Sequence, residues 1–307
     1  MSAAEPTVAV VGSVNLDLVA RVREFPRAGE TVLGSDYHEA PGGKGLNQAL
    51  GAVRRGATAL VGAVGDDPVG DRVVAHAAGR GLDVTGVHRV AGLTGRALIT
   101  VAPDGENVIV VAPLANGELT AGHVTTELDR VAPDVVLAQY EIGEAPLRAA
   151  AEWCAAHDAR FVFNASPVRA IGLDLLRACD PVVVNAAEGL ALLRASEALR
   201  PRDTSDVAAL VSGGGAWRPA DVARRLLEVC PSAVVTAGGS GAFVADAEGV
   251  EHVEGSSRVV AVDSTGAGDE FAGVLAAELA GGATLRAAAR AANDAAGALV
   301  QVARDQR

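Results

Sequence analysis

Aromatic side chains and lysine are scarce in this chain. Phenylalanine, tryptophan and tyrosine make up 3% of its 307 residues, so the sequence offers no aromatic platform on which single-stranded nucleic acid could stack. Lysine occurs once, at Lys44, although the chain holds 26 lysine and arginine residues in total. An ammonium group differs from a guanidinium in size and donor geometry. Lys44 is therefore a candidate for a specific role, with chance placement as the alternative.

Positive charge is also in the minority, because 26 basic residues face 38 acidic ones and the net charge is -12. This balance argues against a general polyanion-binding surface and against an anionic membrane as partner. The six histidines are scattered without the spacing of metal ligands, which argues against a zinc or iron site. Three widely spaced cysteines suit core positions in a reducing compartment and imply no disulfide framework. They are Cys154, Cys179 and Cys230.

The amino terminus lacks a basic region, and the apolar run at residues 8–11 is too short for a signal peptide or a membrane span. We therefore expect a soluble cytoplasmic protein. With half of its residues hydrophobic, the chain can bury a large core built from small aliphatic side chains.

Short β-branched runs alternate with stretches of helical periodicity. This alternation predicts an α/β fold with a mainly parallel central sheet, helices on both of its faces, and ligands bound beyond the carboxyl ends of the strands. We treat residues 1–307 as a single domain. The runs that predict strands are 8–11, 58–64, 135–139, 161–164, 182–185 and 233–236.

Two regions break the alternation. Residues 19–38 and 96–111 have the pattern of short, half-polar strands joined by turns. They predict a small β lid over the main domain, with ordinary edge hairpins as the alternative. Residues 199–217 are rich in Arg, Asp, Ser and Gly and suggest a mobile surface insertion.

The most informative motif lies at residues 263–269, just before a helical pattern. Gly266, Ala267 and Gly268 can present backbone N–H groups to an anion at the start of that helix. Asp269 follows where it could accept a proton beside that anion. The motif indicates phosphoryl transfer to a hydroxyl; the alternative is an ordinary strand-to-helix turn with Asp269 as a first-turn carboxylate.

Further polar residues follow other predicted strands. Asn15 and Asp17 come after the first strand, and alternation in an extended segment would point both side chains to one side, toward sugar hydroxyls. Residues 41–48 combine glycines with Lys44 and Asn47 at the start of a helix. Their spacing is not that of a P-loop, and the first strand is not followed by a dinucleotide fingerprint.

Three more segments place polar or glycine-rich residues at strand ends. Glu141 follows one strand, whereas Asn185 and Glu188 follow another and suit either magnesium, water and phosphate or a helix cap. The segment 236–241, with Thr236 and Gly238, suits nucleotide phosphates or is a plain glycine turn.

Together these motifs resemble the ribokinase-like, or PfkB, family of sugar kinases over nearly the whole chain, closest to ribokinase. The two signatures that carry the resemblance are residues 42–48 and residues 263–269. Supporting segments in the same order and spacing lie at 12–17, 25–31, 65–70, 105–107 and 185–188.

The resemblance implies ATP-dependent phosphorylation of a primary sugar hydroxyl, with Asp269 as the base, the amides of Gly266 to Gly268 as an anion hole, and Mg2+ as cofactor. It also implies a homodimer formed through the lid. A nucleoside kinase of the same family and a catalytically weak sugar- or nucleotide-binding protein are the alternatives. The positions that match sugar-binding residues are Asn15, Asp17, Gly43, Lys44, Asn47, Glu141 and Asp269. Those that match nucleotide-binding residues are Asn185, Thr236, Gly238, Gly241, Gly268 and Asn293, with Glu188 near magnesium.

The sequence departs from the family pattern at two places. Glu270 stands where ribokinases usually have threonine, and we expect its carboxylate to face solvent and not to lie desolvated beside Asp269. Asp263 and Thr265 match one half of a potassium site, but the glycine-containing loop that forms the other half is not recognisable after residue 298. This departure puts potassium activation in doubt.

Overall fold

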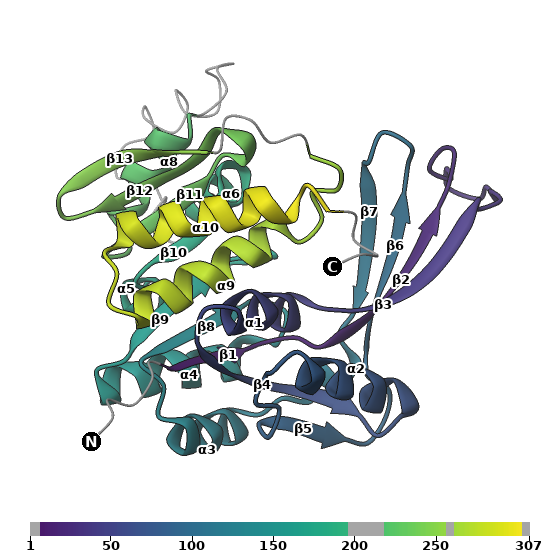
Figure 1. Ribbon diagram of the computed structural model, residues 1–307, viewed down its shortest axis with the longest axis horizontal. Helices are drawn as coiled ribbons and strands as arrows, with labels where there is room; N and C mark the ends of the chain where they lie inside the picture. The colour runs from purple at the N-terminus through teal and green to yellow at the C-terminus, as the bar shows by residue number, and fades with distance from the viewer. Residues whose placement is uncertain (1–6, 196–217, 256–260, 303–307) are drawn as a thin grey trace.

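The computed structural model describes residues 7–195, 218–255 and 261–302. The predicted insertion at 199–217 therefore lies outside the described residues. Two sheets organise the described part of the chain (Figure 1). A nine-stranded sheet has the order β13-β12-β11-β10-β9-β8-β1-β4-β5, and a four-stranded sheet has the order β3-β2-β6-β7.

The nine-stranded sheet is parallel from β5 to β11, and only β12 and β13 at one edge pair antiparallel. Its inner strands are short apolar runs, which is the pattern of strands covered on both faces. The predicted fold class is confirmed. The strands are β1 (Thr7–Val11), β4 (Ala57–Gly65), β5 (Val87–Val90), β8 (Val135–Gln139), β9 (Arg160–Asn164), β10 (Val182–Asn185), β11 (Ala233–Thr236), β12 (Gly241–Asp246) and β13 (Gly249–Glu254).

Helices cover both faces of this sheet and form a core on each. Alternation along β1 illustrates the division, because Ala9 and Val11 belong to one core whereas Val8 and Val10 belong to the other. The first core is covered by α3 (Ala121–Val131), α4 (Glu144–His157), α5 (Leu173–Ala178), α6 (Ala186–Ala195) and α8 (Pro219–Leu226). The second is covered by α1 (Lys44–Val53), α2 (Pro68–Gly79), α9 (Ala267–Ala280) and α10 (Leu285–Leu299).

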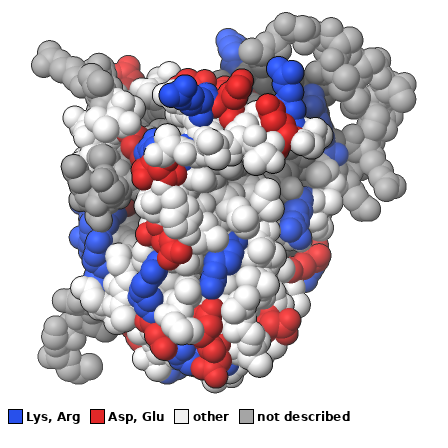
Figure 2. All heavy atoms as spheres, turned by 90° about the vertical axis from the view of Figure 1, so that its right-hand side faces the viewer, with Lys and Arg blue, Asp and Glu red and all other residues white. Residues whose placement is uncertain are grey.

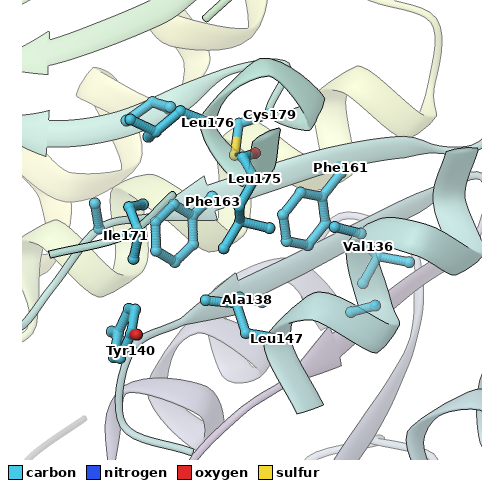
Figure 3. Packing of buried hydrophobic residues seen from close by; sticks show 14 of the residues in the cluster. Val136, Ala138, Tyr140, Leu147, Phe161, Phe163, Ile171, Leu175, Leu176 and Cys179 are labelled. Carbon is cyan, nitrogen blue, oxygen red and sulfur yellow. Dashed lines mark hydrogen bonds between the residues drawn. The ribbon is translucent and has the colours of Figure 1, made fainter. Parts of the chain in front are cut away.

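Large side chains are concentrated in the first core (Figure 3). Phe161 and Phe163 of β9 are stacked with their ring centroids 6.3 Å apart, and Leu147 of α4 and Leu176 of α5 are fully buried in the same cluster. The second core contains many alanines on α9 and α10, which lets these helices lie close to α1 and to the sheet.

The smaller sheet consists of β2 (Asn15–Arg21), β3 (Asp36–Gly42), β6 (Gly95–Val101) and β7 (Asn107–Ala112), and it projects from the main body (Figure 1). β2 begins before, and β3 ends after, the predicted segment 19–38, so both strands reach nearer to the main sheet than predicted. Residues 22–35 between them do not form a strand. The reason is the pairing of Asn15 with both Gly42 and Gly95, which extends the sheet to its attachment point.

Among the described residues, no helix has the length and apolar character needed to cross a membrane.

Candidate active site

Four strand ends and two helix starts meet at one edge of the main sheet. The strands β1, β8, β9 and β10 run parallel, so their carboxyl ends lie on the same side. The first residues of α1 and α9 reach this edge, since side chains at both helix starts contact each other there. Ligand sites of open α/β sheets lie beyond such strand ends.

The start of α1 is shaped by a glycine and by a carboxylate from another strand. Gly43 has a φ of 95°, and a Cβ atom there would lie 2.9 Å from the backbone oxygen of Ser13. The Lys44 amide donates to Glu141 Oε2 at 3.2 Å, and the Ser13 hydroxyl donates to the same oxygen at 2.5 Å. Glu141, which follows β8, thus holds the amino-terminal end of α1.

Charge around Lys44 is strongly negative. Burial opposes the charged ammonium, but attraction by Asp269, Glu141 and Glu188 outweighs burial and leaves the pKa of Lys44 above its ordinary value. Burial raises the pKa of Glu141, and this effect exceeds the opposing hydrogen bond from Ser13 and the nearby charge of Lys44. The ammonium at Lys44 is therefore kept charged among three carboxylates, two from the predicted sugar set and one from the predicted nucleotide set.

Asn15 and Asp17 lie on the same face of β2 and are buried, with exposed fractions of 1% and 5%. Asn116, in the short 3₁₀ helix η1 (Leu114–Glu118), donates to Asn15 Oδ1 at 2.7 Å. A Cβ atom at Gly42 would overlap the Asp17 carboxyl group, and one at Gly95 would overlap the Asn15 amide. The glycines therefore make room for the two polar side chains.

Asp269 lies in the first turn of α9, after Gly266 with a φ of 80°. Asn47 Nδ2 donates to Asp269 Oδ2 at 3.3 Å, and Gln48 Nε2 donates to Oδ1 at 3.0 Å. The Ala267 amide donates to the Ser264 backbone oxygen at 3.2 Å, so it is already engaged in the turn. The structure thus joins the two signature motifs at the Asp269 carboxylate.

The prediction that Glu270 faces solvent is wrong. Its side chain is 7% exposed and forms an ion pair with Arg54, which is the C-cap of α1 and is 47% exposed. The pattern misleads because α9 packs against α1 as well as against the sheet, so a position next to Asp269 points into the contact between the helices. A Cβ atom at Gly51 would lie 3.1 Å from Glu270 Oε2.

Asn185 and Glu188 cap α6 reciprocally. The Asn185 backbone amide donates to Glu188 Oε2 at 2.9 Å, and the Glu188 backbone amide donates to Asn185 Oδ1 at 2.8 Å. This is the capping-box arrangement, so the helix-cap alternative describes these contacts. Glu188 nevertheless lies close enough to Lys44 to raise its pKa.

The other predicted nucleotide residues lie around the ends of β11 and β13. Thr236 pairs with Asn185 across β10 and β11, and Gly238 and Gly241, with φ values of 57° and 95°, bracket the 3₁₀ turn η3 (Gly238–Ser240). Asn293 of α10 donates to the Val253 backbone oxygen at 3.2 Å. It is therefore attached to the β12–β13 hairpin.

The predicted half-site for potassium forms a tight turn. The Thr265 amide donates to Asp263 Oδ1 at 2.8 Å, and the Val262 and Asp263 amides donate to the Val300 backbone oxygen at 2.7 and 3.1 Å. The other half of the potassium site would follow residue 298, and residues 303–307 of that segment lie outside the described residues. Potassium activation therefore stays in doubt.

Several residues of this edge are missing from the sequence-based prediction. They are buried polar residues that orient the predicted site residues. The sequence signal that could have found them is a polar residue at a position of a strand or helix that is otherwise apolar. The set is Ser13, Gln48, Asn116, Gln139 and Asn164.

Comparison with known proteins supports the same interpretation. The model of the pfkB family of carbohydrate kinases matches residues 5–307. The chain belongs to this family. Ribokinase from Bacillus subtilis is 32% identical over 302 residues, which cover 94% of this chain and 91% of that protein. Ribokinase from Haemophilus influenzae is 31% identical over 276 residues, which cover 87% of this chain and 83% of the relative.

Solved structures of this kinase family have the same fold. Ribokinase from Thermotoga maritima gives a TM-score of 0.79 at 28% identity, covering 98% of this chain and 95% of that one. Ribokinase from Giardia lamblia gives a TM-score of 0.81 at 29% identity, covering 97% and 93%. The predicted family and fold are therefore confirmed, and this carbohydrate kinase is a phosphotransferase that acts on a sugar hydroxyl.

Proposed function

We propose that this carbohydrate kinase is a ribokinase, which transfers the γ-phosphoryl group of ATP to a primary hydroxyl of ribose. Relatives at about 30% identity that carry the name ribokinase support the substrate. The observation that carries the chemistry is the Asp269 carboxylate, which receives hydrogen bonds from Asn47 and Gln48 at the start of α9. Asn15, Asp17, Gly43, Lys44, Asn47 and Glu141 would hold the sugar beside it.

In the proposed reaction Asp269 accepts the proton of the sugar hydroxyl while the hydroxyl oxygen forms a bond to the γ-phosphorus. The bond between that phosphorus and the bridging oxygen of ADP breaks. Gly266 and Gly268 would direct backbone amides at the transferring group, and the charged Lys44 would attract its oxygens. These groups stabilise charge where it develops, at the positive end of the α9 dipole.

ATP would lie along the ends of β10 and β11, against Asn185, Thr236, Gly238, Gly241 and Gly268, with its base or ribose near Asn293. Glu188 fits Mg2+ held through water, because its carboxylate caps α6 at this edge and acts on Lys44. Mg2+ bound to the phosphates would neutralise part of their charge. The described residues hold no cluster of three or more acidic, cysteine or histidine ligands for a metal, which fits an ion held mainly by phosphates and water.

The test is sugar-dependent release of ADP by the wild-type protein and by Asp269→Asn. We expect the variant to lose at least about 1,000-fold in kcat, because proton transfer and positioning at the reacting hydroxyl are both removed. Asp104→Asn, in the exposed β6–β7 turn, is the matched control and should keep full activity. Turnover by Asp269→Asn equal to that of wild type would disprove the mechanism.

A substrate panel of ribose, deoxyribose, fructose, adenosine and pseudouridine decides the substrate class. We expect the highest kcat/KM with ribose. A preference for a nucleoside would overturn the substrate assignment but not the phosphotransfer. Calorimetric sugar binding without ADP release at any monovalent salt would instead favour a binding protein.

We also propose a homodimer formed through the small sheet, which would act as a lid over the sugar. Its edge strand β7 exposes a row of apolar side chains, among them Val108, Ile109 and Val110 with exposed fractions of 51%, 49% and 62%. Figure 2 looks at the side from which this sheet projects, where uncharged residues form broad areas between charged ones. An unpaired apolar edge is a ready template for a second copy.

Analytical ultracentrifugation tests this assembly. We expect the wild type to sediment as a dimer at micromolar concentration and Val110→Glu to sediment as a monomer. A monomeric wild type would overturn the proposal. A cytoplasmic location is proposed as well, since the three cysteines are free and buried.

A further inference from the structure

A chain of buried amide side chains lies behind the Asp269 carboxylate. Gln48 Nε2 donates to Asp269 Oδ1 and to Asn164 Oδ1, at 3.0 Å in each case. Gln139 Nε2 donates to Gln48 Oε1 at 2.9 Å. Asn164 Nδ2 in turn donates to the Val183 backbone oxygen at 3.0 Å. The chain thus connects the carboxylate to the last residues of β8 and β9.

These contacts fix which end of the Gln48 amide faces Asp269. Both N–H bonds of its amide are used by acceptors, and its oxygen receives a donor from Gln139. A flipped amide would face the carboxylate with an oxygen and Gln139 with a donor, so it would lose all three bonds. Gln48 is fully buried, which leaves no water to replace them.

The bond from Gln48 also distinguishes the two oxygens of Asp269. Oδ1 receives the 3.0 Å bond from an amide that is itself anchored at two points. Oδ2 receives a longer bond, 3.3 Å, from Asn47, which is only partly buried at the start of α1. Oδ2 therefore keeps more capacity to accept a proton.

One atom of the chain is unsatisfied, and this indicates a role other than stability. Among the described residues, Gln139 Oε1 is the buried side-chain oxygen or nitrogen without a hydrogen-bond partner. It lies against Gly12, where a Cβ atom would overlap it. An unpaired buried acceptor destabilises the folded state, so the unpaired Oε1 offsets the stability that Gln139 gains from the bond it donates to Gln48.

We infer that Gln48, oriented by Gln139 and Asn164, is a positioning residue that holds Asp269 Oδ1 so that Oδ2 takes the proton of the sugar hydroxyl. This inference rests on the proposed function and deepens it. The proton moves from the hydroxyl to Oδ2, the hydroxyl oxygen bonds to the γ-phosphorus, and ADP leaves. Gln48 donates throughout and neither gains nor loses a proton.

The experiment compares Gln48→Met and Gln139→Met with the wild type. Methionine keeps the length of the side chain and removes its hydrogen bonds. We expect Gln48→Met to lower kcat by roughly 10- to 100-fold, the range for a lost hydrogen bond to a charged group, while KM for ribose changes less than about threefold. Gln301→Met, at an exposed glutamine just beyond the end of α10, is the matched control and should change neither value.

Gln139→Met keeps the test decisive if Gln48→Met folds poorly. Removing the unpaired Gln139 Oε1 should stabilise the fold, whereas leaving Gln48 Oε1 without its donor should destabilise it. Because these effects oppose each other, the melting temperature should change little. We expect kcat nonetheless to fall by about 3- to 30-fold, because the Gln48 amide loses one of its anchors.

The outcomes separate this inference from the proposed function. A wild type that phosphorylates ribose, together with methionine variants that fold and keep wild-type kcat, would overturn the positioning role alone. A lower melting temperature with unchanged kcat in the folded protein would also overturn it, since that pattern indicates packing only. A wild type that binds ribose but releases no ADP would overturn the proposed function and this inference with it.

Discussion

Truncating Arg54 should destabilise the protein because it removes the cation that pairs with a buried carboxylate. In the structure Arg54 at the end of α1 forms an ion pair with Glu270, whose side chain is 7% exposed. Arg54→Ala removes the cation but leaves the Glu270 carboxylate between α1 and α9. Removing one partner of a buried pair is costly because the other charge stays desolvated.

The magnitude follows from the exposure of the two side chains. Breaking a fully buried pair costs about 3–5 kcal/mol, whereas an exposed pair contributes about 0–1 kcal/mol. Arg54 is 47% exposed, so its removal admits water to one side of Glu270, and we expect about 2–3 kcal/mol. An unfolding entropy of about 2.1 cal/mol/K per residue over 307 residues converts this to a drop in Tm of about 3–5 °C.

Differential scanning calorimetry of four variants checks the reasoning. Arg55→Ala is the matched control, since Arg55 is about as exposed as Arg54 and pairs with Glu278 of α9 at 3.5 Å, but the Glu278 side chain is 29% exposed whereas that of Glu270 is 7% exposed. It should lower the free energy of unfolding by less than about 1 kcal/mol. Glu270→Thr alone should cost about 1 kcal/mol or less, because the half-exposed Arg54 can turn to water.

The double variant Arg54→Ala with Glu270→Thr gives the sharpest comparison. Because it no longer buries a carboxylate that has lost its arginine, it should be more stable than Arg54→Ala alone, by about 1–2 kcal/mol. A double variant less stable than Arg54→Ala, or an Arg54→Ala variant that melts with the wild type, would refute the reasoning.

Three shorter predictions concern the sugar side of the site. Gly42→Ala should raise KM for ribose about 10-fold or more in steady-state assays, because the new Cβ overlaps the Asp17 carboxyl group; an unchanged KM would count against a sugar contact by Asp17. Lys44 is the single lysine, so a lysine-selective acylating reagent should add one label besides the α-amino group by mass spectrometry, and saturating ribose should slow that labelling. If calorimetry shows that ribose binds but ribose does not slow the labelling of Lys44, contact between the sugar and Lys44 is excluded. Glu141→Gln should stabilise the protein at neutral pH: the pKa of Glu141 is raised by burial, so the wild type loses stability as pH rises through that raised pKa whereas glutamine does not ionise. The difference in Tm between Glu141→Gln and the wild type should therefore shrink toward pH 4, and a difference that does not shrink would contradict this.

The sequence was a good guide wherever a local pattern determines the structure. All six β-branched runs named from it are strands of the main sheet, because continuous burial on both faces requires apolar residues along the whole strand. The positions of Asn15 and Asp17 on one face of β2 followed from the alternation of an extended chain. The ends of β2 and β3 were less accurate, since pairing with β6 lengthens them beyond their local pattern.

The residues that were missed depend on contacts between distant segments. Gln48 and Asp269 are 221 positions apart, and no local pattern indicates that α1 and α9 meet. Their close approach requires Gly51 and Gly273, since a Cβ at Gly273 would overlap the Gln48 backbone oxygen. Sequence periodicity places each helix against the sheet but says nothing of the angle between two helices on the same face.

The same contact explains both the failed prediction for Glu270 and the role inferred for Gln48. Consecutive residues of a helix point about 100° apart, so when α9 turns Asp269 toward the start of α1, Glu270 is turned toward the middle and end of α1. Arg54, six positions after Gln48, neutralises the carboxylate there. A threonine at position 270 would need no such partner. The pair formed by Arg54 and Glu270 therefore holds the end of α1 against α9, while Gln48 and Asn47 hold the first part of α1 against it. Loss of the ion pair should therefore lower Tm and leave kcat nearly unchanged, whereas loss of the Gln48 amide should lower kcat.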